Sequence, residues 1–271
     1  MTIDQIRQPV ANEFNLFLEE YRRRTQSHVE LLEQVVEYLS HFPGKQLRPL
    51  LVLLSAQACQ HLSSLHVKLA TAVELLHNAS LMHDDVVDES NSRRNHESIR
   101  HRWGNQVAVL CGDYFLAQVM TLIQEVGSPK VSSALSQTVA TMCQGELMQL
   151  SAIHKKVKAS SYIDIIGSKT ASLLATCCQF GALSPKDSQE SPFSQNLYDF
   201  GYHYGIVFQI RDDINDFNQD HDVALPEDIS PSQLIEEHTL LAQKALRPLP
   251  NSPAKQTLLD MLLPSAPQPV C

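Results

Sequence analysis

The sequence predicts an all-α fold, and two observations carry that prediction. Glycine is scarce, with 9 among 271 residues, and long stretches are rich in Leu, Ala, Val and Gln. Two acidic triplets of identical spacing also end apolar, helix-patterned segments. The chain is long enough to bury a substantial core and shows neither an internal repeat nor a convincing domain boundary. We therefore expect one helical domain over residues 1–271.

Apolar and amphipathic patterns divide the chain into helices. Residues 1–41 predict two amphipathic helices, broken near Arg24–Ser27. Further helices are predicted over residues 50–60, 66–89, 105–126, 132–153, 160–182, 196–217, 231–247 and 253–263. Gly127–Pro129 breaks the long run between two of them. We expect residues 264–271, PSAPQPVC, to form a disordered tail.

A turn and two cations precede the helix predicted from residue 50. Pro43 and Gly44 predict the turn, and Pro49 suits the first turn of the helix. Lys45 and Arg48 therefore lie at a loop-to-helix junction, where backbone N–H groups and the helix dipole favour an anion. Taken alone, this segment fits two ordinary surface cations better.

The segment 77–94, HNASLMHDDVVDESNSRR, carries the first acidic triplet, Asp84, Asp85 and Asp88. On a helix Asp84 and Asp88 lie one turn apart on the same face, with Asp85 beside them. Carboxylates crowded in this way repel one another and resist burial, so they need a compensating charge. Mg²⁺ takes oxygen ligands and keeps positions for water and substrate phosphate. For one triplet alone, a solvated acidic helix end is an equal alternative.

A second triplet tips the balance toward a metal site. Asp212, Asp213 and Asp216 repeat the i, i+1, i+4 spacing after the apolar run GYHYGIVFQI. Two identical triplets, each ending a hydrophobic helix, predict two walls of one Mg²⁺ site. The pair is much more specific than either triplet alone.

Cationic residues accompany the triplets. The polar loop ESNSRRNHES carries adjacent Arg93 and Arg94, and guanidinium groups bind phosphate oxygens in bidentate fashion. We expect this pair to meet a diphosphate held by the first triplet, with a solvent-facing loop as the alternative. Lys169 and Thr170 interrupt the apolar run of residues 160–182. A lysine buried in such a run requires a partner anion.

Composition and cysteine spacing limit the class of protein. The net charge of −9 argues against a nucleic-acid binder. The six cysteines lack CxxC spacing and mostly lie in apolar segments, which indicates reduced thiols in the cytoplasm. The N-terminal residues show no signal-peptide pattern. No uninterrupted apolar run reaches the ~18 residues of a spanning helix, so we expect a soluble protein without a transmembrane segment.

Several motifs together resemble those of one enzyme family. In order they are GKQLRP at 44–49, HNASLMHDDVVD at 77–88, the arginine pair at 93–94, GDYFLA at 112–117, QGELMQ at 144–149, KTASL at 169–173 and FQIRDDIND at 208–216. Across nearly its whole length the chain resembles the trans-isoprenyl diphosphate synthases, or polyprenyl synthetases. The resemblance implies an isoprenoid synthase-type bundle of about ten helices around a central cavity. It also implies a homodimer.

The resemblance further implies a reaction, condensation of isopentenyl diphosphate with an allylic diphosphate such as farnesyl or geranylgeranyl diphosphate. The implied Mg²⁺ ligands are Asp84, Asp85, Asp88 and Asp212, assisted by Asp213 and Asp216. Arg93 and Lys169 would bind the allylic diphosphate. The isopentenyl diphosphate would be bound by Lys45, Arg48, His77 and Arg94. Thr170 and Gln209 would line the reacting centre.

Small residues before the first triplet bear on product length. The growing chain is expected to pass beside this helix, so Ala79 and Ser80, one turn before Asp84, act as its floor. Short-chain members of the family often carry a bulky aromatic residue there. Leu76 and Val73 are candidates for a deeper stop. The resemblance therefore favours a medium- or long-chain synthase.

The chain departs from the family pattern after the second triplet. The family usually continues with a Gly-Lys loop and a further lysine before Leu-Pro, whereas FNQDHDVALPEDI here reaches Leu225-Pro226 without a lysine. The C-terminal closing basic residue is also absent, and Asn95 replaces a glycine after the arginine pair. These losses keep open an impaired or regulatory subunit that needs a partner in a heteromeric prenyl synthase.

Two other classes are weaker alternatives. A metal-dependent phosphohydrolase could use His77, His83 and Asp84, but it leaves the second triplet and the arginine pair unexplained. A class I terpene cyclase shares the DDxxD motif but does not need Lys45, Arg48 and His77. We interpret His83 as a helix residue packed near the metal site and not as a ligand.

Overall fold

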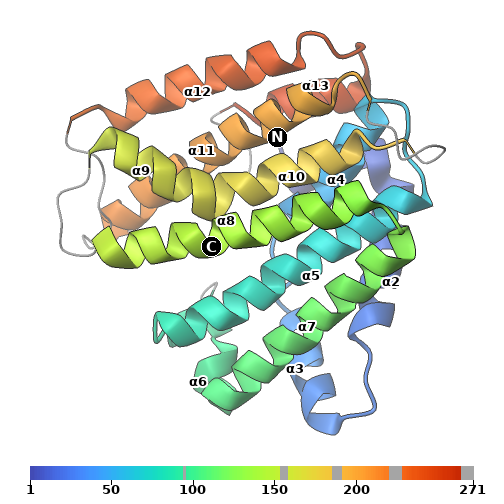
Figure 1. The fold of residues 1–271 in the computed structure, drawn as a ribbon, viewed down its shortest axis with the longest axis vertical. Helices are drawn as coiled ribbons and strands as arrows, with labels where there is room; N and C mark the ends of the chain where they lie inside the picture. The colour runs from blue at the N-terminus through green and yellow to red at the C-terminus, as the bar shows by residue number, and fades with distance from the viewer. Residues whose placement is uncertain (94–95, 153–157, 185–190, 220–227, 264–271) are drawn as a thin grey trace.

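The structure is a computed structural model of the chain, and it describes all residues except 94–95, 153–157, 185–190, 220–227 and 264–271. Of residues 216–219 it describes the backbone only. Figure 1 shows a bundle of helices. In this part of the chain the only strands are β1 (Ser92–Arg93) and β2 (His96–Glu97), a two-residue antiparallel pair. The all-α prediction is confirmed. The predicted tail, 264–271, lies outside the described residues.

Most helices fall where the sequence pattern predicts them, but the helix at Ile99–Trp103 lies in no predicted range, and residues 3–25 form three elements instead of one helix. The helices are α1 (Ile3–Arg7), η1 (Gln8–Val10), α2 (Ala11–Thr25), α3 (Glu30–Ser40), α4 (Leu47–Ala58), α5 (Ser64–Val87), α6 (Ile99–Trp103), α7 (Asn105–Val126), α8 (Pro129–Ala152), α9 (Ala159–Ile166), the π-helical turn η2 (Gly167–Ala171), α10 (Ser172–Gly181), α11 (Ser194–Gln219), α12 (Pro231–Leu246) and α13 (Pro253–Asp260). The predicted helix over residues 160–182 is therefore one continuous rod with a π turn in its middle.

Local sequence sets several of these ends. Gln46 adopts a left-handed backbone, with φ of 52°, directly before α4, and Pro49 lies in the first turn of that helix. Gly127, with φ of 66°, caps α7 by donating its N–H to the carbonyl of Ile123. The predicted break at Gly127–Pro129 is confirmed, whereas residues 42–46, which include Pro43 and Gly44, form an irregular segment with no regular turn, in which Gly44 has φ of 65°.

α5 lies at the centre of the packing. It contacts α7, α4 and α2, and Figure 1 shows it running between α7 and α8. α10 packs against α11 and α4, while α12 covers α11. One cluster of buried hydrophobic residues extends from Ile6 in α1 to Leu262 after α13. A smaller cluster, built around Tyr162, Ile206 and Ile210, joins α9 and η2 to α11.

Two glycines allow helices to approach closely around η2. A Cβ atom at Gly145 of α8 would lie 2.6 Å from the backbone nitrogen of Lys169. A Cβ atom at Gly205 of α11 would lie 2.6 Å from the Cα atom of Ala171. Because both contacts leave no room for a side chain, glycine lets α8 and α11 press against the π turn from two sides.

One helix carries an unusual amount of uncovered apolar surface. Within the described residues, α7 is the one helix long and apolar enough to cross a membrane by length and composition, and 33% of its most apolar stretch is buried. The prediction of no spanning segment rested on uninterrupted apolar runs, and Asp113 interrupts this one. Helices packed inside soluble proteins have the same composition.

Candidate active site

The first aspartate triplet lies at the C-terminal end of α5. Asp84 and Asp85 belong to the helix and Asp88 caps it, donating its N–H to the Asp84 carbonyl at 2.8 Å. Burial and the nearby Glu146 carboxylate raise the pKa of Asp84 to about 6, against the opposing charges of Lys169 and Arg93. A bound cation would oppose this rise in pKa, because its positive charge favours the ionised form of Asp84.

Asp85 is paired with the first arginine of the predicted pair. Arg93, on β1, donates from Nε at 3.0 Å and from a terminal nitrogen at 2.6 Å to one oxygen of Asp85. Asp85 is 3% exposed; burial raises its pKa, and the Arg93 guanidinium opposes that rise. The short hairpin β1–β2 thus brings Arg93 back to the end of α5. Arg94 lies outside the described residues.

The π turn η2 aims two polar side chains at two different helices. Lys169 forms an ion pair with Glu146 of α8 at 2.7 Å and donates to the Gln149 side chain at 3.1 Å. The partner anion required by Lys169 is therefore Glu146. Thr170 donates to the Gln209 side chain of α11 at 2.8 Å. π turns recur at functional sites because they redirect side chains within a helix.

Asp213 of the second triplet accepts hydrogen bonds from neutral groups. Asp212 is 3% exposed on α11. Asp213 accepts a hydrogen bond from the Tyr162 hydroxyl at 2.5 Å and another from the Gln209 amide at 2.8 Å. Because Gln209 in turn accepts from Thr170, a chain of three hydrogen bonds orients Asp213. The side chain of Asp216 lies outside the described part of the chain.

Tyr162 is a site residue that the sequence did not single out. Burial and the Asp213 carboxylate raise the pKa of its hydroxyl, which keeps the group protonated as a donor. It is 5% exposed on α9. The signal that could have found it is its spacing of eight residues before Thr170, about two turns of helix, since both side chains reach α11.

The carboxylates of the site could bind a hard cation if water and substrate phosphate supplied its remaining ligands. Within the described residues, no group of three or more His, Cys, Asp or Glu side chains could hold a metal ion by itself. Mg²⁺ in proteins is commonly bound by one or two carboxylates with water and substrate phosphate completing its shell. The buried carboxylates of Asp85 and Asp212 and the half-buried carboxylate of Asp84 fit that mode. The predicted Mg²⁺ site stays a prediction.

The predicted isopentenyl-binding residues lie on two elements. Lys45 precedes α4, Arg48 is its second residue, and both are partly exposed. His77, which is 9% exposed, lies two turns before Asp84 on the same face of α5. Their role as diphosphate ligands stays a prediction.

The predicted chain-length residues do not share one face of α5. Ser80 is partly exposed one turn before Asp84. Ala79 is fully buried, and a step of five residues turns it about 140° away from Asp84. Val73 and Leu76 are 0% and 3% exposed. Of these residues, Ser80 and Val73 point in the direction of Asp84, and the chain-length role of the set stays a prediction.

His83 faces away from the carboxylates. Its ring lies over Gly112 of α7, where an added Cβ would come within 2.3 Å of the ring nitrogen, and it lies 3.3 Å from the Val109 carbonyl. Asp113 is its nearest carboxylate, at 3.5 Å. The interpretation of His83 as a packed helix residue is confirmed, and a phosphohydrolase site would lack this ligand.

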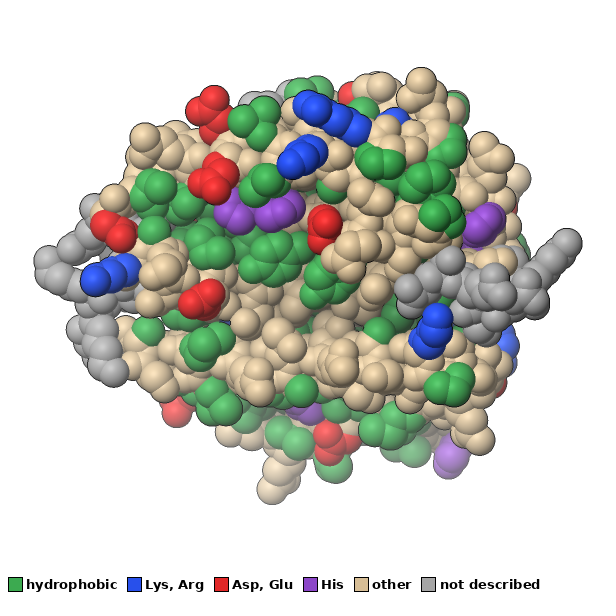
Figure 2. All heavy atoms as spheres, turned by 45° about the horizontal axis from the view of Figure 1, so that its top comes forward, with side chains coloured by type: hydrophobic (Ala, Val, Ile, Leu, Met, Phe, Trp, Pro, Cys, Tyr) green, Lys and Arg blue, Asp and Glu red, His purple; other side chains and the backbone are tan. Residues whose placement is uncertain are grey.

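The face of the molecule seen in Figure 2 carries both signs of charge. On the face seen in Figure 2, basic side chains are scattered among acidic and hydrophobic ones and form no continuous stripe. Nucleic-acid binders normally present such a stripe.

The fold and the two aspartate walls define a class, the all-α isoprenoid synthases. Residues 29–261 match the polyprenyl synthetase family. The chain belongs to this family. The predicted bundle is confirmed by a decaprenyl diphosphate synthase from Rhodobacter capsulatus, which superimposes with a TM-score of 0.83 at 27% identity over 96% of this chain and 97% of that one.

Two further proteins are similar. A polyprenyl synthase from Caulobacter crescentus, solved with calcium and isoprenyl diphosphate, has a TM-score of 0.86 at 24% identity, covering 96% of both chains. The heptaprenyl diphosphate synthase component 2 of Geobacillus stearothermophilus is 37% identical over 200 residues. That match covers 73% of this chain and 62% of the relative, so the chain spans less than two thirds of the relative's length.

Proposed function

We propose that this protein is a trans-prenyltransferase that condenses isopentenyl diphosphate with an allylic diphosphate to give a longer polyprenyl diphosphate. The observation that carries the proposal is the position of Asp84, half-buried at the end of α5 within range of Lys169 from η2 and Arg93 from β1. Carboxylates and cations from separate elements are what a diphosphate with bound metal ions requires. Farnesyl and geranylgeranyl diphosphate are the expected primers.

The residues of this chain would share the work of ionising the primer. Asp84, Asp85, Asp88 and Asp212, with Asp213 and Asp216, are the proposed ligands of Mg²⁺. When bound, Mg²⁺ stabilises the negative charge that develops on the departing diphosphate. The calcium and isoprenyl diphosphate in the Caulobacter enzyme support this assignment.

Two cations already in the site would bind the diphosphate directly. Lys169 is held by Glu146 and Arg93 by Asp85, so both are positioned before substrate arrives. A diphosphate oxygen can replace either carboxylate as acceptor. The carbocation that remains needs an apolar, water-free surrounding, which the buried faces of α5 and α10 supply.

An assay of the purified protein tests the proposal. Labelled isopentenyl diphosphate would be supplied with Mg²⁺ and, separately, geranyl, farnesyl or geranylgeranyl diphosphate, and the dephosphorylated products would be sized. We expect medium- or long-chain products that disappear when EDTA is added. A folded protein that incorporates no label with any primer contradicts a self-sufficient enzyme.

The same assay separates the alternatives. The Geobacillus relative is named as component 2 of its synthase, which supports a heteromeric arrangement as the second candidate. In that case label is incorporated only when a partner subunit is added. Release of phosphate from the primer without chain extension would instead indicate a phosphohydrolase.

We also propose that the protein forms a homodimer through α7 and α8 and acts in the cytoplasm. Leu110 and Met120 of α7 are 67% and 71% exposed, and Leu147 of α8 is 64% exposed. Apolar surface of this kind is typical of subunit interfaces. The mass in solution tests the dimer: Leu110→Glu should yield monomer, and a wild-type monomer contradicts it.

The described cysteines are free thiols, which supports the proposed cytoplasmic location, because the cytoplasm is a reducing compartment.

A further inference from the structure

A cavity lies behind the first aspartate triplet, on another face of α5. It has a volume of about 350 Å³ and is enclosed by α2, α3, α5 and the hairpin β1–β2. Small-molecule sites commonly measure ~300–1,000 Å³, so the cavity suffices for a small ligand. Of the predicted site residues that the structure describes, only Asp85 and Arg93 line it. We call it the α2–α3 cavity.

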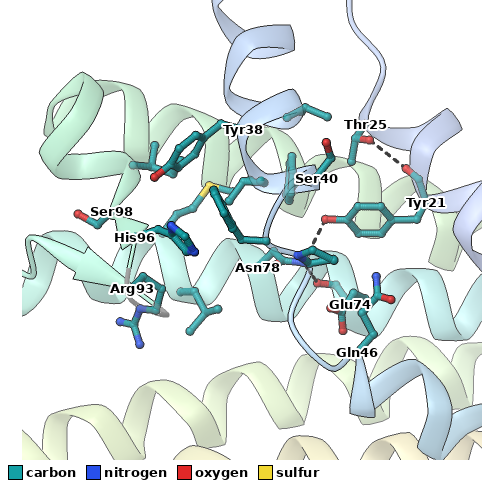
Figure 3. Close-up of a pocket in the computed structure, with 18 of the residues that line it drawn as sticks. Tyr21, Thr25, Tyr38, Ser40, Gln46, Glu74, Asn78, Arg93, His96 and Ser98 are labelled. Atoms are coloured by element: carbon teal, nitrogen blue, oxygen red, sulfur yellow. Dashed lines mark hydrogen bonds between the residues drawn. The ribbon is translucent and has the colours of Figure 1, made fainter. Parts of the chain in front are cut away.

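The walls of the α2–α3 cavity are mainly apolar. The hydrophobic lining comes from α2, α3, α5 and α7 and includes Leu18, Tyr21, Val36, Tyr38, Met82 and Phe115. Figure 3 shows Tyr38, His96, Ser98 and Arg93 at one end and Tyr21, Thr25, Asn78 and Glu74 toward the other. Such a lining suits a hydrocarbon body with a polar end.

Two arginines at the cavity have no carboxylate partner. Arg7 and Arg22 both line it, and within the described part of the chain neither forms an ion pair. Arg7 lies over the Phe14 ring at 4.5 Å, and within the described residues its buried Nε has no hydrogen-bond acceptor. A buried donor without an acceptor is costly, and an anionic group in the cavity would supply one.

The cavity shares a wall with the candidate active site. Asp85 and Arg93 line it and are joined there by the 2.6 Å ion pair. A ligand in the cavity therefore contacts, from behind, one carboxylate and one cation of the proposed diphosphate site. Any displacement of Arg93 would change the charge that a substrate meets.

We propose that the α2–α3 cavity is a regulatory site for an acidic amphiphile, a short hydrocarbon chain that ends in a phosphate or a carboxylate. Its action on the reaction rests on the proposed function, since it works through Asp85 and Arg93. Binding itself does not depend on catalysis. The two can therefore be tested apart.

The single tryptophan of the chain reports on the cavity. Trp103 packs edge-on against Tyr38 with ring centroids 5.3 Å apart, and Tyr38 lines the cavity. The full-length protein would be titrated in EDTA, where metal-dependent diphosphate binding is absent. The probes are geranyl monophosphate, decanoate and the neutral alcohol geraniol. We expect a saturable change of Trp103 fluorescence, about tenfold tighter for an acid than for geraniol.

The two acids distinguish the source of the ligand. Tighter binding of geranyl monophosphate indicates an isoprenoid phosphate, and tighter binding of decanoate indicates a fatty acid. Both outcomes support the site. No saturable change with any probe overturns it, whether or not the protein synthesises prenyl chains.

Paired variants locate the binding. Val36→Phe fills the cavity from α3 and should weaken binding about tenfold, whereas Val29→Phe adds the same atoms at a position that is 49% exposed. Arg22→Gln, at an exposed position, should abolish the preference for acids, and Arg23→Gln outside the cavity should not. Thermal melting checks folding. If Val36→Phe and Arg22→Gln both bind like wild type, the proposal is wrong.

Discussion

The two aspartate triplets have the same spacing but lie in different surroundings. At the end of α5, Asp84 and Asp85 are set among charges, namely Arg93, Glu146 and Lys169. On α11, Asp213 is held by the neutral donors Tyr162 and Gln209. The protonation of the first triplet therefore depends on the charges around it, whereas the orientation of Asp213 in the second triplet is fixed before any ligand binds. Identical spacing in sequence does not imply an identical role.

Removing a carboxylate from the charged wall should have the largest effect. Asp84→Ala deletes a proposed metal ligand, so we expect kcat for prenyl transfer to fall roughly 10³-fold. The matched control is Asp113→Ala, which removes an exposed carboxylate on the neighbouring helix α7. Equal activity of the two variants would show that Asp84 is no ligand.

Loosening the neutral wall should have a smaller and different effect. Tyr162→Phe removes a neutral donor to Asp213, so the Mg²⁺ concentration for half-maximal activity should rise about tenfold. Tyr198→Phe, on α11, should leave it unchanged, because the Tyr198 hydroxyl makes no hydrogen bond within the described residues. A fall in kcat at saturating Mg²⁺, with no change in metal requirement, would refute an orienting role for Tyr162.

Lowering the pH should weaken Mg²⁺ binding at the first triplet, because it protonates Asp84. The pKa of Asp84 is raised to about 6, above its unfolded value of about 3.9. Protonation therefore stabilises the metal-free fold; this contribution is complete below about pH 4 and is lost as the pH rises through 6. Since Mg²⁺ must displace the proton, its affinity should fall about tenfold per unit below pH 6.

That pH dependence is measured by Mg²⁺ titration of the wild type and of Asp84→Asn. The variant has no proton to displace and should bind weakly with little dependence on pH. A wild-type affinity that stays constant between pH 5 and 7 would contradict the raised pKa of Asp84.

The smallest expected effect comes from a variant that separates the two causes of the raised pKa of Asp84, namely burial and the Glu146 charge. Glu146→Gln removes the neighbouring charge and leaves the burial of Asp84 in place. We expect the midpoint of the pH dependence to move down by less than about one unit. Glu37→Gln, an exposed change on α3, is the control. A midpoint that moves up would show that Glu146 acts chiefly by holding Lys169.

Much of the fold followed from pattern, and the site followed only in part. The predicted helix over residues 105–126 matches α7 because Gly104 and Gly127 bound a largely apolar run. The π turn could not be predicted, since the period of residues 160–182 continues through it. Tyr162 was missed for a related reason: one buried tyrosine among apolar residues resembles core packing. The pairing of Arg93 with Asp85 depends on a hairpin too short to leave a pattern.

The extra residue in the π turn η2 lets one helix direct adjacent side chains toward two different helices, α8 and α11. Consecutive residues of an α-helix point about 100° apart, and the wider turn lets Lys169 reach α8 while Thr170 reaches α11. Deleting one residue between 167 and 171 would restore a regular helix and rotate everything beyond it. Lys169 would then lose its contact with α8, and Thr170 would lose its hydrogen bond to Gln209, which orients Asp213. A single inserted amino acid thus couples the two walls of the site.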